Sequence, residues 1–325
     1  MIGYIFRRIV YGFFILLGVN ALTFALFFAV NTPDDMARLS IGGRYVTQQA
    51  IDSWKKERGY DVPLIFNSAA EGTGKFTETI FFRRSAPLLA GEFGLSDTGR
   101  SINTEIKERA PASLALALPT FLLGVFVSVS FALILVMVRR TRLEWAGVAM
   151  SVTVMSISAL FYIIVGQWLF SKTLRWVPVS GFSEGFAMAA FLVLPVAIGV
   201  FTRLGGEALL YRSMFLEESE KDYVRTARAK GVSEMRVLFR HVLGNAMLPV
   251  ITSTVAVIPM LFMGSLIMEN FFGIPGLGSY TIDAINAQDF SVVRAMVFLG
   301  TAAYILGLIL TDVAYTVVDP RIRLK

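Results

Sequence analysis

The residue types that usually perform catalysis are scarce in this sequence. It has one histidine, His241, and no cysteine, so a typical zinc site or a thiolate nucleophile cannot be built. The nearest match to a phosphate-binding loop, Gly72-Thr-Gly-Lys75, lacks the first glycine at the required spacing and continues with Phe76. No HExxH or G-x-S-x-G motif occurs. The sequence predicts no enzyme and no cofactor of its own, and if the protein performs energised work, another chain supplies the hydrolysis.

Ionisable residues that could relay a proton or hold a coupling ion are also few. Asp312 lies near the end of the last apolar run and Arg203 near the end of the fourth. We expect these two to form a structural ion pair, with a coupling-ion site as the alternative. His241 is predicted to be an interfacial residue, because a proton relay normally places ionisable groups deep within the membrane spans.

The most informative charged segment, Ser219–Pro249, lies between two long uncharged apolar runs. Ser219 and Asp222 have the S-x-x-D form of a capping box, and acidic residues crowd the same end, so a helix is predicted to begin near Glu220. Gly231 is expected to end this helix in a left-handed conformation. The pattern therefore predicts a short helix that stops at a glycine turn.

A second helix is predicted after that turn, capped by Ser233 and entering the membrane at Leu243. On the first helix, Tyr223, Ala227 and Lys230 are spaced to share one face, and alanine is small enough for close approach by a partner's backbone. Two hypotheses remain open from the residues alone. The face could dock a partner protein, or the segment could lie on lipid headgroups.

The elements that must position this segment are membrane spans. Of 325 residues, 55% are hydrophobic, and a spanning helix needs about 20 apolar residues. Six runs without Asp, Glu, Lys or Arg qualify: Ile9–Val30, Ala112–Val138, Trp145–Phe170, Gly185–Thr202, Leu243–Met268 and Ala295–Thr311. The sequence predicts an all-α membrane protein with six transmembrane helices.

The basic residues predict the orientation of these helices. Lys and Arg gather at both termini, after the second run and between the fourth and fifth, which places these parts in the cytoplasm. The net charge of +6 then reflects orientation, not nucleic acid binding. We expect an N-terminal transmembrane helix (1–30), a small lobe outside the membrane (31–111) between helices 1 and 2, and a five-helix core (112–325). The charged loop 217–242 lies between helices 4 and 5 of this core.

Several stretches resemble one family. The sequence DYVRTARAKG from Asp222, with Leu248-Pro249 further on, is similar to the EAA loop of binding-protein-dependent ABC importer permeases. Thr226-Ala227-Arg228 stand where the family has E-A-A, although the first and third residues differ and the distance from Gly231 to Leu248 is longer than usual. Glu269–Gly278, ENFFGIPGLG, is close to the family's motif after the fifth helix. The resemblance covers nearly the whole chain and is nearest to the dipeptide and oligopeptide branch, including its Yej-type subgroup.

This resemblance implies specific roles. The charged loop would form a cytoplasmic coupling helix that lies in a cleft of an ATPase subunit, with Tyr223, Ala227 and Gly231 central. The coupling residues would be Asp222, Tyr223, Arg225, Thr226, Ala227, Arg228, Lys230 and Gly231. The lobe would be periplasmic, and a turn containing Glu269, Pro275, Gly276 and Gly278 would face the same side.

The resemblance also implies partners. These are a second homologous permease, two ATPase subunits that bind ATP and Mg, a periplasmic binding protein and a peptide substrate, in the bacterial inner membrane with both termini cytoplasmic. Substrate-binding residues are not predicted. Nickel, glutathione or oligosaccharides are alternative cargoes of the same architecture. An ion-coupled secondary transporter is the alternative of another class, although it would need acids at the membrane midplane or broken half-helices.

Overall fold

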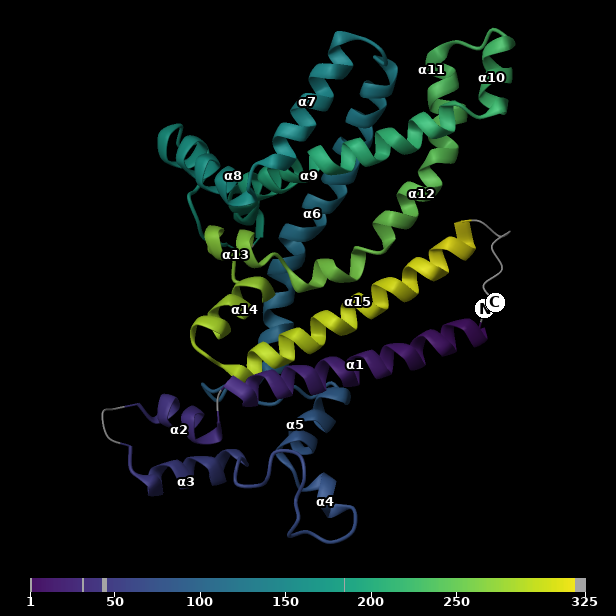
Figure 1. The fold of residues 1–325 in the computed structure, drawn as a ribbon. Coiled ribbons are helices and arrows are strands. Elements are labelled where there is room, and N and C mark those ends of the chain that lie inside the picture. Colours follow the sequence, from purple (N-terminus) through teal and green to yellow (C-terminus); the bar gives the residue numbers. More distant parts are fainter. Residues whose placement is uncertain (1, 31, 43–45, 184, 319–325) are drawn as a thin grey trace. The chain divides into compact units, whose positions relative to one another are not determined.

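The computed structural model describes residues 2–30, 32–42, 46–183 and 185–318, and within these ranges the regular elements are helices (Figure 1). Internal contacts divide the chain into two units. Unit 1 contains Glu108–Ile282 and the residues from Ala303 onward, and unit 2 contains Ile2–Lys107 and Asp283–Ala302. The all-helical architecture predicted from the sequence is confirmed for the described residues.

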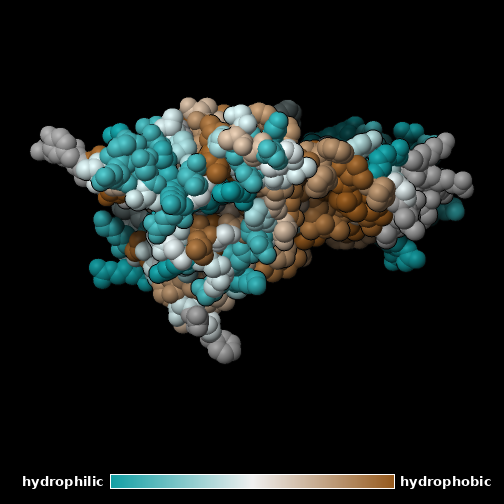
Figure 2. All heavy atoms as spheres, turned by 90° about the horizontal axis from the view of Figure 1, so that it is seen from below, coloured by the Kyte–Doolittle hydropathy of each residue, from teal (hydrophilic) through white to brown (hydrophobic). Residues whose placement is uncertain are grey.

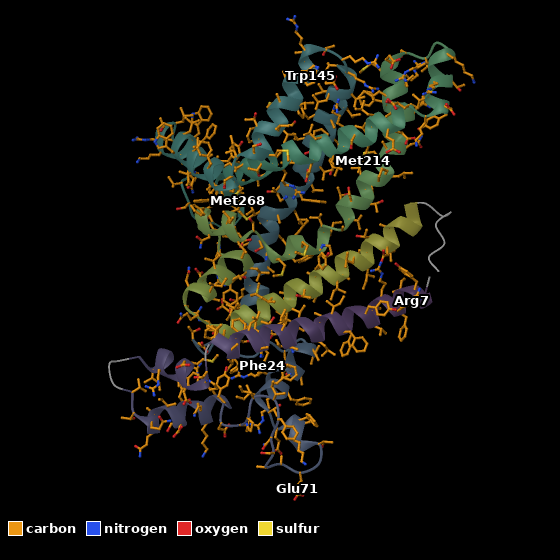
Figure 3. All side chains as sticks on the ribbon, viewed as in Figure 1. Arg7, Phe24, Glu71, Trp145, Met214 and Met268 are labelled. Atoms are coloured by element: carbon orange, nitrogen blue, oxygen red, sulfur yellow. The ribbon has the colours of Figure 1, made fainter. Side chains whose placement is uncertain are left out.

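Unit 2 begins with a long apolar helix and continues with four short ones. These are α1 (Ile2–Val30), α2 (Pro33–Ile41), α3 (Gln48–Arg58), α4 (Gly74–Thr77) and α5 (Ile80–Leu89). A threonine precedes each of α2, α3 and α5, and its side chain accepts a hydrogen bond from a backbone N–H of the first turn. Aromatic side chains join the elements: Phe24 of α1, labelled in Figure 3, meets Phe81 of α5 with ring centroids 5.1 Å apart.

Unit 1 contains the larger set of helices, three of which (α6, α14 and α15) run from one unit into the other. The helices are α6 (Ile102–Met137), α7 (Arg142–Ser156), α8 (Ala159–Gly166), α9 (Met188–Ser219), α10 (Asp222–Ala229), α11 (Glu234–Arg236), α12 (Leu243–Val255), α13 (Leu266–Phe272), α14 (Leu277–Asn286) and α15 (Phe290–Val318). π-helical turns follow α8 and α11, and a 3-10 helix, Ile258–Met263, follows α12.

Five helical segments among the described residues are long and apolar enough to cross a membrane, or six if one bent pair counts as a span. The bent pair is the predicted third span, Trp145–Phe170, which is not one straight helix. The chain breaks after Ser156, and the two arms differ in direction by 92°. Ile157 is extended, and the Ser158 hydroxyl accepts a hydrogen bond from the Leu160 N–H, so α8 starts as a newly capped helix.

The end of the predicted fifth span also differs from the structure. Leu243–Met268 was expected to be one helix, but the spanning segment, which already begins at Glu234, ends at Met263. Pro259 falls in the 3-10 helix, and Gly264 then turns the backbone with φ +71°. Met268 therefore belongs to α13, a separate helix.

Other parts of the chain leave much of the apolar surface of the helices uncovered. On α1, Phe6, Phe14 and Leu22 are more than 60% exposed. Figure 2 shows a continuous hydrophobic surface in its right half, where α1 runs. Exposed apolar surface of this extent is unfavourable in water and suits contact with lipid chains. The protein is therefore a multi-span membrane protein.

Candidate functional site

The helix α10 lies in the charged segment Ser219–Pro249, but it begins at Asp222 and not near Glu220, where the sequence predicted its start. Ser219 is the last residue of α9, and its hydroxyl donates to the Leu216 carbonyl at 2.8 Å. The predicted capping box is wrong, because α9 continues through this residue and leaves its side chain buried. Lys221 occupies the N-cap position, without a side-chain hydrogen bond to the helix.

Gly231 ends α10 as predicted. Its φ is +78°, a left-handed conformation that glycine adopts without a Cβ clash. The Gly231 N–H donates to the Arg228 carbonyl at 2.9 Å, and the Val232 N–H donates to the Ala227 carbonyl at 3.2 Å. These two bonds form a Schellman motif, which satisfies carbonyls at the helix end. The carboxyl end of α10 is thus sharply defined.

Two residues anchor α10 to the helices around it. Val224 is fully buried and Ala227 is 7% exposed, and both belong to a hydrophobic cluster with residues of α6, α9, α12 and the π-helical turn before α12. Met214, labelled on α9 in Figure 3, packs against this cluster. Ala227 therefore contributes to packing inside the chain and has little exposed side-chain surface, and its coupling role stays a prediction.

The rest of α10 and its glycine turn are open to solvent. Each of the other predicted coupling residues is exposed: Asp222, Tyr223, Arg225, Thr226, Arg228, Lys230 and Gly231. Arg228 is nevertheless constrained, because its Nε donates to Glu234 at 3.0 Å and its Nη1 donates to the Ser219 carbonyl at 3.2 Å. The bond from Arg228 to Glu234 thus connects α10 to α11, which lies next to it (Figure 1).

Tyr223 is a second link between α10 and its neighbours. Its hydroxyl donates to the Glu218 carboxylate and accepts a hydrogen bond from the Asn245 side chain at 2.8 Å. Asn245 also donates to the His241 carbonyl at 3.1 Å. Burial, followed by the bond to Glu218, raises the pKa of Tyr223 above its ordinary value. His241 contributes its backbone here from a half-buried position.

Two ion pairs near this region were not predicted. Arg139, just after α6, contacts Glu220 at 3.1 Å, and Arg212 of α9 donates to the buried carboxylate of Glu144 on α7. The Arg140 backbone N–H also donates to Glu144, at 2.5 Å. Each pair joins segments far apart in the sequence. Arg139 and Glu144 lie next to the ends of apolar runs, but the sequence contains no signal that pairs them with Glu220 and Arg212.

The predicted turn after the fifth span is built around a buried carboxylate. Glu269 is fully buried in α13 and accepts hydrogen bonds from the Ser113 hydroxyl (2.8 Å) and from the Ser265 and Ser279 N–H groups (both 3.0 Å). Ser113 of α6 in turn accepts from the Leu277 N–H at 2.8 Å. Burial raises the pKa of Glu269, while these donors oppose the rise.

The glycines of this turn leave room for that carboxylate. A Cβ atom added to Gly276 would lie 2.5 Å from the Ser113 hydroxyl, and one added to Gly278 would lie 2.7 Å from the Ser265 carbonyl carbon. Pro275 is exposed beside them. The predicted turn residues Glu269, Gly276 and Gly278 are therefore brought together in one closely packed structure.

Arg203 forms an ion pair within its own helix. Among the described residues, its carboxylate contact is Glu207, whose Oε1 lies 2.8 Å from Nε and 2.5 Å from Nη2. Ser128 of α6 donates to the other Glu207 oxygen at 3.1 Å. Because α9 continues beyond Thr202, it places Glu207 one turn after Arg203, and the Arg203–Asp312 pair stays a prediction. Asp312 lies on α15.

Arg203 also borders a cavity inside unit 1. The cavity has a volume of about 320 Å³ and lies between α6, α8, α9, the 3-10 helix and α13. Thr120, Ile163, Gly199 and Met268 are among its lining residues, which are mostly apolar (Figure 3 labels Met268). Among the described residues, no group of three His, Cys, Asp or Glu side chains could hold a metal ion.

Long apolar helices around an internal cavity, with a braced polar helix between two of the spans, are features of a membrane transport protein. Comparison with known families identifies the kind. The family described as "Binding-protein-dependent transport system inner membrane component" matches residues 112–324, and the N-terminal family "Binding-prot-dependent transport system membrane comp, N-term" matches residues 1–117. The chain belongs to this family of binding-protein-dependent transport system membrane components.

Individual relatives are similar over the full length. A putative peptide transport system permease protein of Brucella abortus (strain 2308) is 30% identical over 328 residues, covering 99% of each chain. The oligopeptide transport system permease protein AppB of Bacillus subtilis is 28% identical over 331 residues, covering 99% of this chain and 100% of AppB. The glutathione transport system permease protein GsiC of Salmonella paratyphi A is 30% identical over 328 residues, covering all of both chains.

Proposed function

We propose that this chain is a permease subunit of an ABC importer that takes up peptides delivered by a periplasmic binding protein. It would form half of the transmembrane path, in the bacterial inner membrane, with both termini cytoplasmic and the segment 31–111 outside. The similarity to peptide permeases along the entire chain carries this proposal. The exposed face of α10, together with the defined carboxyl end of this helix, supports it as well.

In this proposal α10 is the coupling helix for a cytoplasmic ATPase subunit. The exposed residues Tyr223, Arg225, Thr226 and Lys230 would contact the cleft of the ATPase. A movement of the ATPase would act on α10 as a rigid body, because the helix has a Schellman end and a buried anchor at Val224. That anchor packs on α9 and α12, so the movement would reach both helices.

The remaining partners follow from the same proposal. A second, homologous permease would complete the path, and two ATPase subunits would bind ATP and Mg and perform the hydrolysis. The Glu269 turn would lie on the outer side of the membrane, near the docked binding protein. The cavity that Arg203 borders, between α6, α8, α9 and α13, would belong to this chain's half of the path.

Peptides are the favoured cargo, and glutathione is the alternative that a specific observation supports. GsiC is as similar to this chain as the Brucella protein, at 30% identity. Glutathione is itself a modified tripeptide, so both cargoes present amide groups and free carboxylates. Nickel and oligosaccharides share neither feature and have no comparable support among the relatives described above.

Uptake of labelled peptides by the complete transporter, with and without this chain, tests the proposal. We expect import to require this chain, the binding protein and ATP together. Labelled glutathione, measured in parallel, separates the two cargoes. Peptide import that persists without this chain, or that depends on an ion gradient and not on ATP, would overturn the proposal.

The coupling role is tested at Gly231. Substitution by valine strains the left-handed backbone, so α10 should lose its defined end, and we expect peptide-stimulated ATP hydrolysis to fall at least tenfold while the spans remain inserted. Gly244→Ala is the matched control, because Gly244 is helical and a Cβ there meets no atom within 4 Å. Normal coupling in Gly231→Val would show that α10 is not the coupling helix.

A further inference from the structure

A second cavity lies in unit 2 and is lined by charged residues. It has a volume of about 630 Å³ and is bordered by the end of α3, by α5, by the loop 92–99 and by the first turn of α15. Four arginines contribute to its wall: Arg58, Arg83, Arg84 and Arg294. Glu57, Glu92 and Asp97 line it as well. The wall of the cavity therefore carries both signs of charge beside apolar residues such as Phe93 and Leu95.

One of these arginines is already neutralised. Arg58 contacts Asp97 at 2.6 Å through Nη1, and its guanidinium lies 5.0 Å from the centroid of the Trp54 ring. A bidentate or aromatic-stacked arginine of this kind is held in place by its own neighbours. Arg58 is thus part of the cavity wall and needs no further anion.

Arg84 and Arg294 differ from Arg58, because among the described residues neither forms an ion pair with a carboxylate. Arg84 donates to the Arg58 carbonyl at 2.8 Å, and its guanidinium lies 4.7 Å from the centroid of the Tyr60 ring. Arg294 donates to the Arg84 carbonyl at 2.6 Å. The backbone carbonyls and the aromatic ring orient the two side chains, and Asp97 acts on Arg84 through a charge interaction without a direct ion pair.

Both side chains are only partly exposed, and they lie on the wall of the same cavity. Two neighbouring cations that are partly removed from water repel each other, and each loses solvation. A monovalent anion between them would relieve both costs and could accept several N–H donors at once. The carboxylates elsewhere on the wall disfavour a multiply charged anion and suit a ligand that also carries an amine.

We propose that Arg84 and Arg294 form a subsite for the terminal carboxylate of a peptide. This inference rests on the proposed function, in which the segment 31–111 lies outside and meets arriving cargo. A cavity of about 630 Å³ falls within the usual range for small-ligand sites, roughly 300–1,000 Å³. Glu57 and Glu92 on the same wall provide the negative charge for the peptide's amino group.

The test is binding of a labelled tripeptide to the purified complete permease–ATPase complex, without the binding protein. We expect the free acid to bind about tenfold more tightly than the same peptide with an amidated carboxyl end, because a charge-assisted hydrogen bond is lost. Arg294→Gln and Arg84→Gln should each remove most of this difference. Arg294→Lys, which keeps the charge, should restore part of it.

Lys75→Gln is the control, because it removes an exposed positive charge from α4, which does not line the cavity. It should leave the preference for the free acid intact. Basal ATP hydrolysis and elution as an intact complex exclude misassembly of each variant. A preference for the free acid that survives in both arginine-to-glutamine variants would overturn the subsite.

Two further measurements distinguish a bound lipid from a bound peptide, and failure of the subsite from failure of the proposed function. Binding is repeated in phosphatidylcholine discs with and without phosphatidylglycerol. If the arginine variants alter only the binding of the anionic lipid, the site holds a headgroup phosphate and the peptide proposal is wrong. Import by the unmodified transporter is measured in parallel. Import without any acid–amide difference would refute the subsite alone, whereas absence of import would refute the proposed function.

Discussion

At the scale of single residues, polar side chains with several hydrogen-bond partners set the geometry of the surfaces described above. Glu269 joins α6, α13 and α14 through neutral donors, and Tyr223 joins α10 to the end of α9 and to α12. Arg203 and Glu207 satisfy each other within one helix. In each case the side chain is held by several partners, so a substitution of one atom has a defined consequence.

Glu269→Gln tests the carboxylate of the turn. A glutamine amide places an NH₂ group against either the Ser265 or the Ser279 N–H, so one buried donor loses its acceptor. We expect a loss of about 1–3 kcal/mol in stability, seen as a lower unfolding temperature of the purified complex. Glu71→Gln, at the loop tip labelled in Figure 3, is the exposed control. An unchanged unfolding temperature in Glu269→Gln would contradict this account of the turn.

The raised pKa of Tyr223 predicts that the attachment of α10 weakens at alkaline pH. Because its pKa is raised in the folded protein, first by burial and then by Glu218, the neutral phenol is favoured there. Its stabilising contribution is complete below the ordinary pKa of about 10 and is lost as the pH rises through the higher folded-state value. Hydrogen exchange of α10 should therefore accelerate above about pH 10. Tyr223→Phe should lack this step, and an identical step in the variant would assign it to another group.

At the scale of elements, the position of α10 depends on one buried face. Val224 has no exposed surface and packs with α9 and α12, whereas Thr226 on the same helix is exposed. The helix is short, so its own hydrogen bonds do not keep it folded. Tertiary packing of this face, the Tyr223 hydroxyl and the Arg228–Glu234 pair must do so together.

Val224→Ala measures that packing. Removing two buried methyl groups should destabilise the attachment of α10 by about 2 kcal/mol, seen as faster hydrogen exchange in residues 222–229. Peptide-stimulated ATP hydrolysis should fall with it if α10 couples the two subunits. Thr226→Ala should leave exchange unchanged. Equal exchange in both variants would show that Val224 does not anchor the helix.

The bend between α7 and α8 is also a feature at this scale, and the amino-acid composition does not predict it. The run Trp145–Phe170 is apolar throughout and reads as one span, yet the Ser158 cap divides it into arms that differ by 92°. Serine is a weak signal in an apolar run, since it can also bond within a continuous helix. Sequence patterning alone could not distinguish these outcomes.

At the scale of the whole molecule, the sequence was sufficient to predict the class of protein. Apolar runs of spanning length predicted a membrane protein, and the resemblance of the charged segment and of the stretch Glu269–Gly278 to one family then predicted a transport subunit. The comparisons confirm the family over the whole length. The orientation and the identity of the coupling residues stay predictions, and Gly231→Val tests the coupling role.

The sequence by itself determined the helical architecture, most of the spans and the glycine turn at Gly231, because helix length and a positive φ depend on local composition. Only the tertiary structure decided that Ser219 ends α9, that Ala227 packs inward, that Arg203 pairs with Glu207, and that Arg84 and Arg294 share a cavity. Those outcomes depend on which side chains meet when helices pack and on where each helix ends. Neither is encoded in the spacing of charges along the chain.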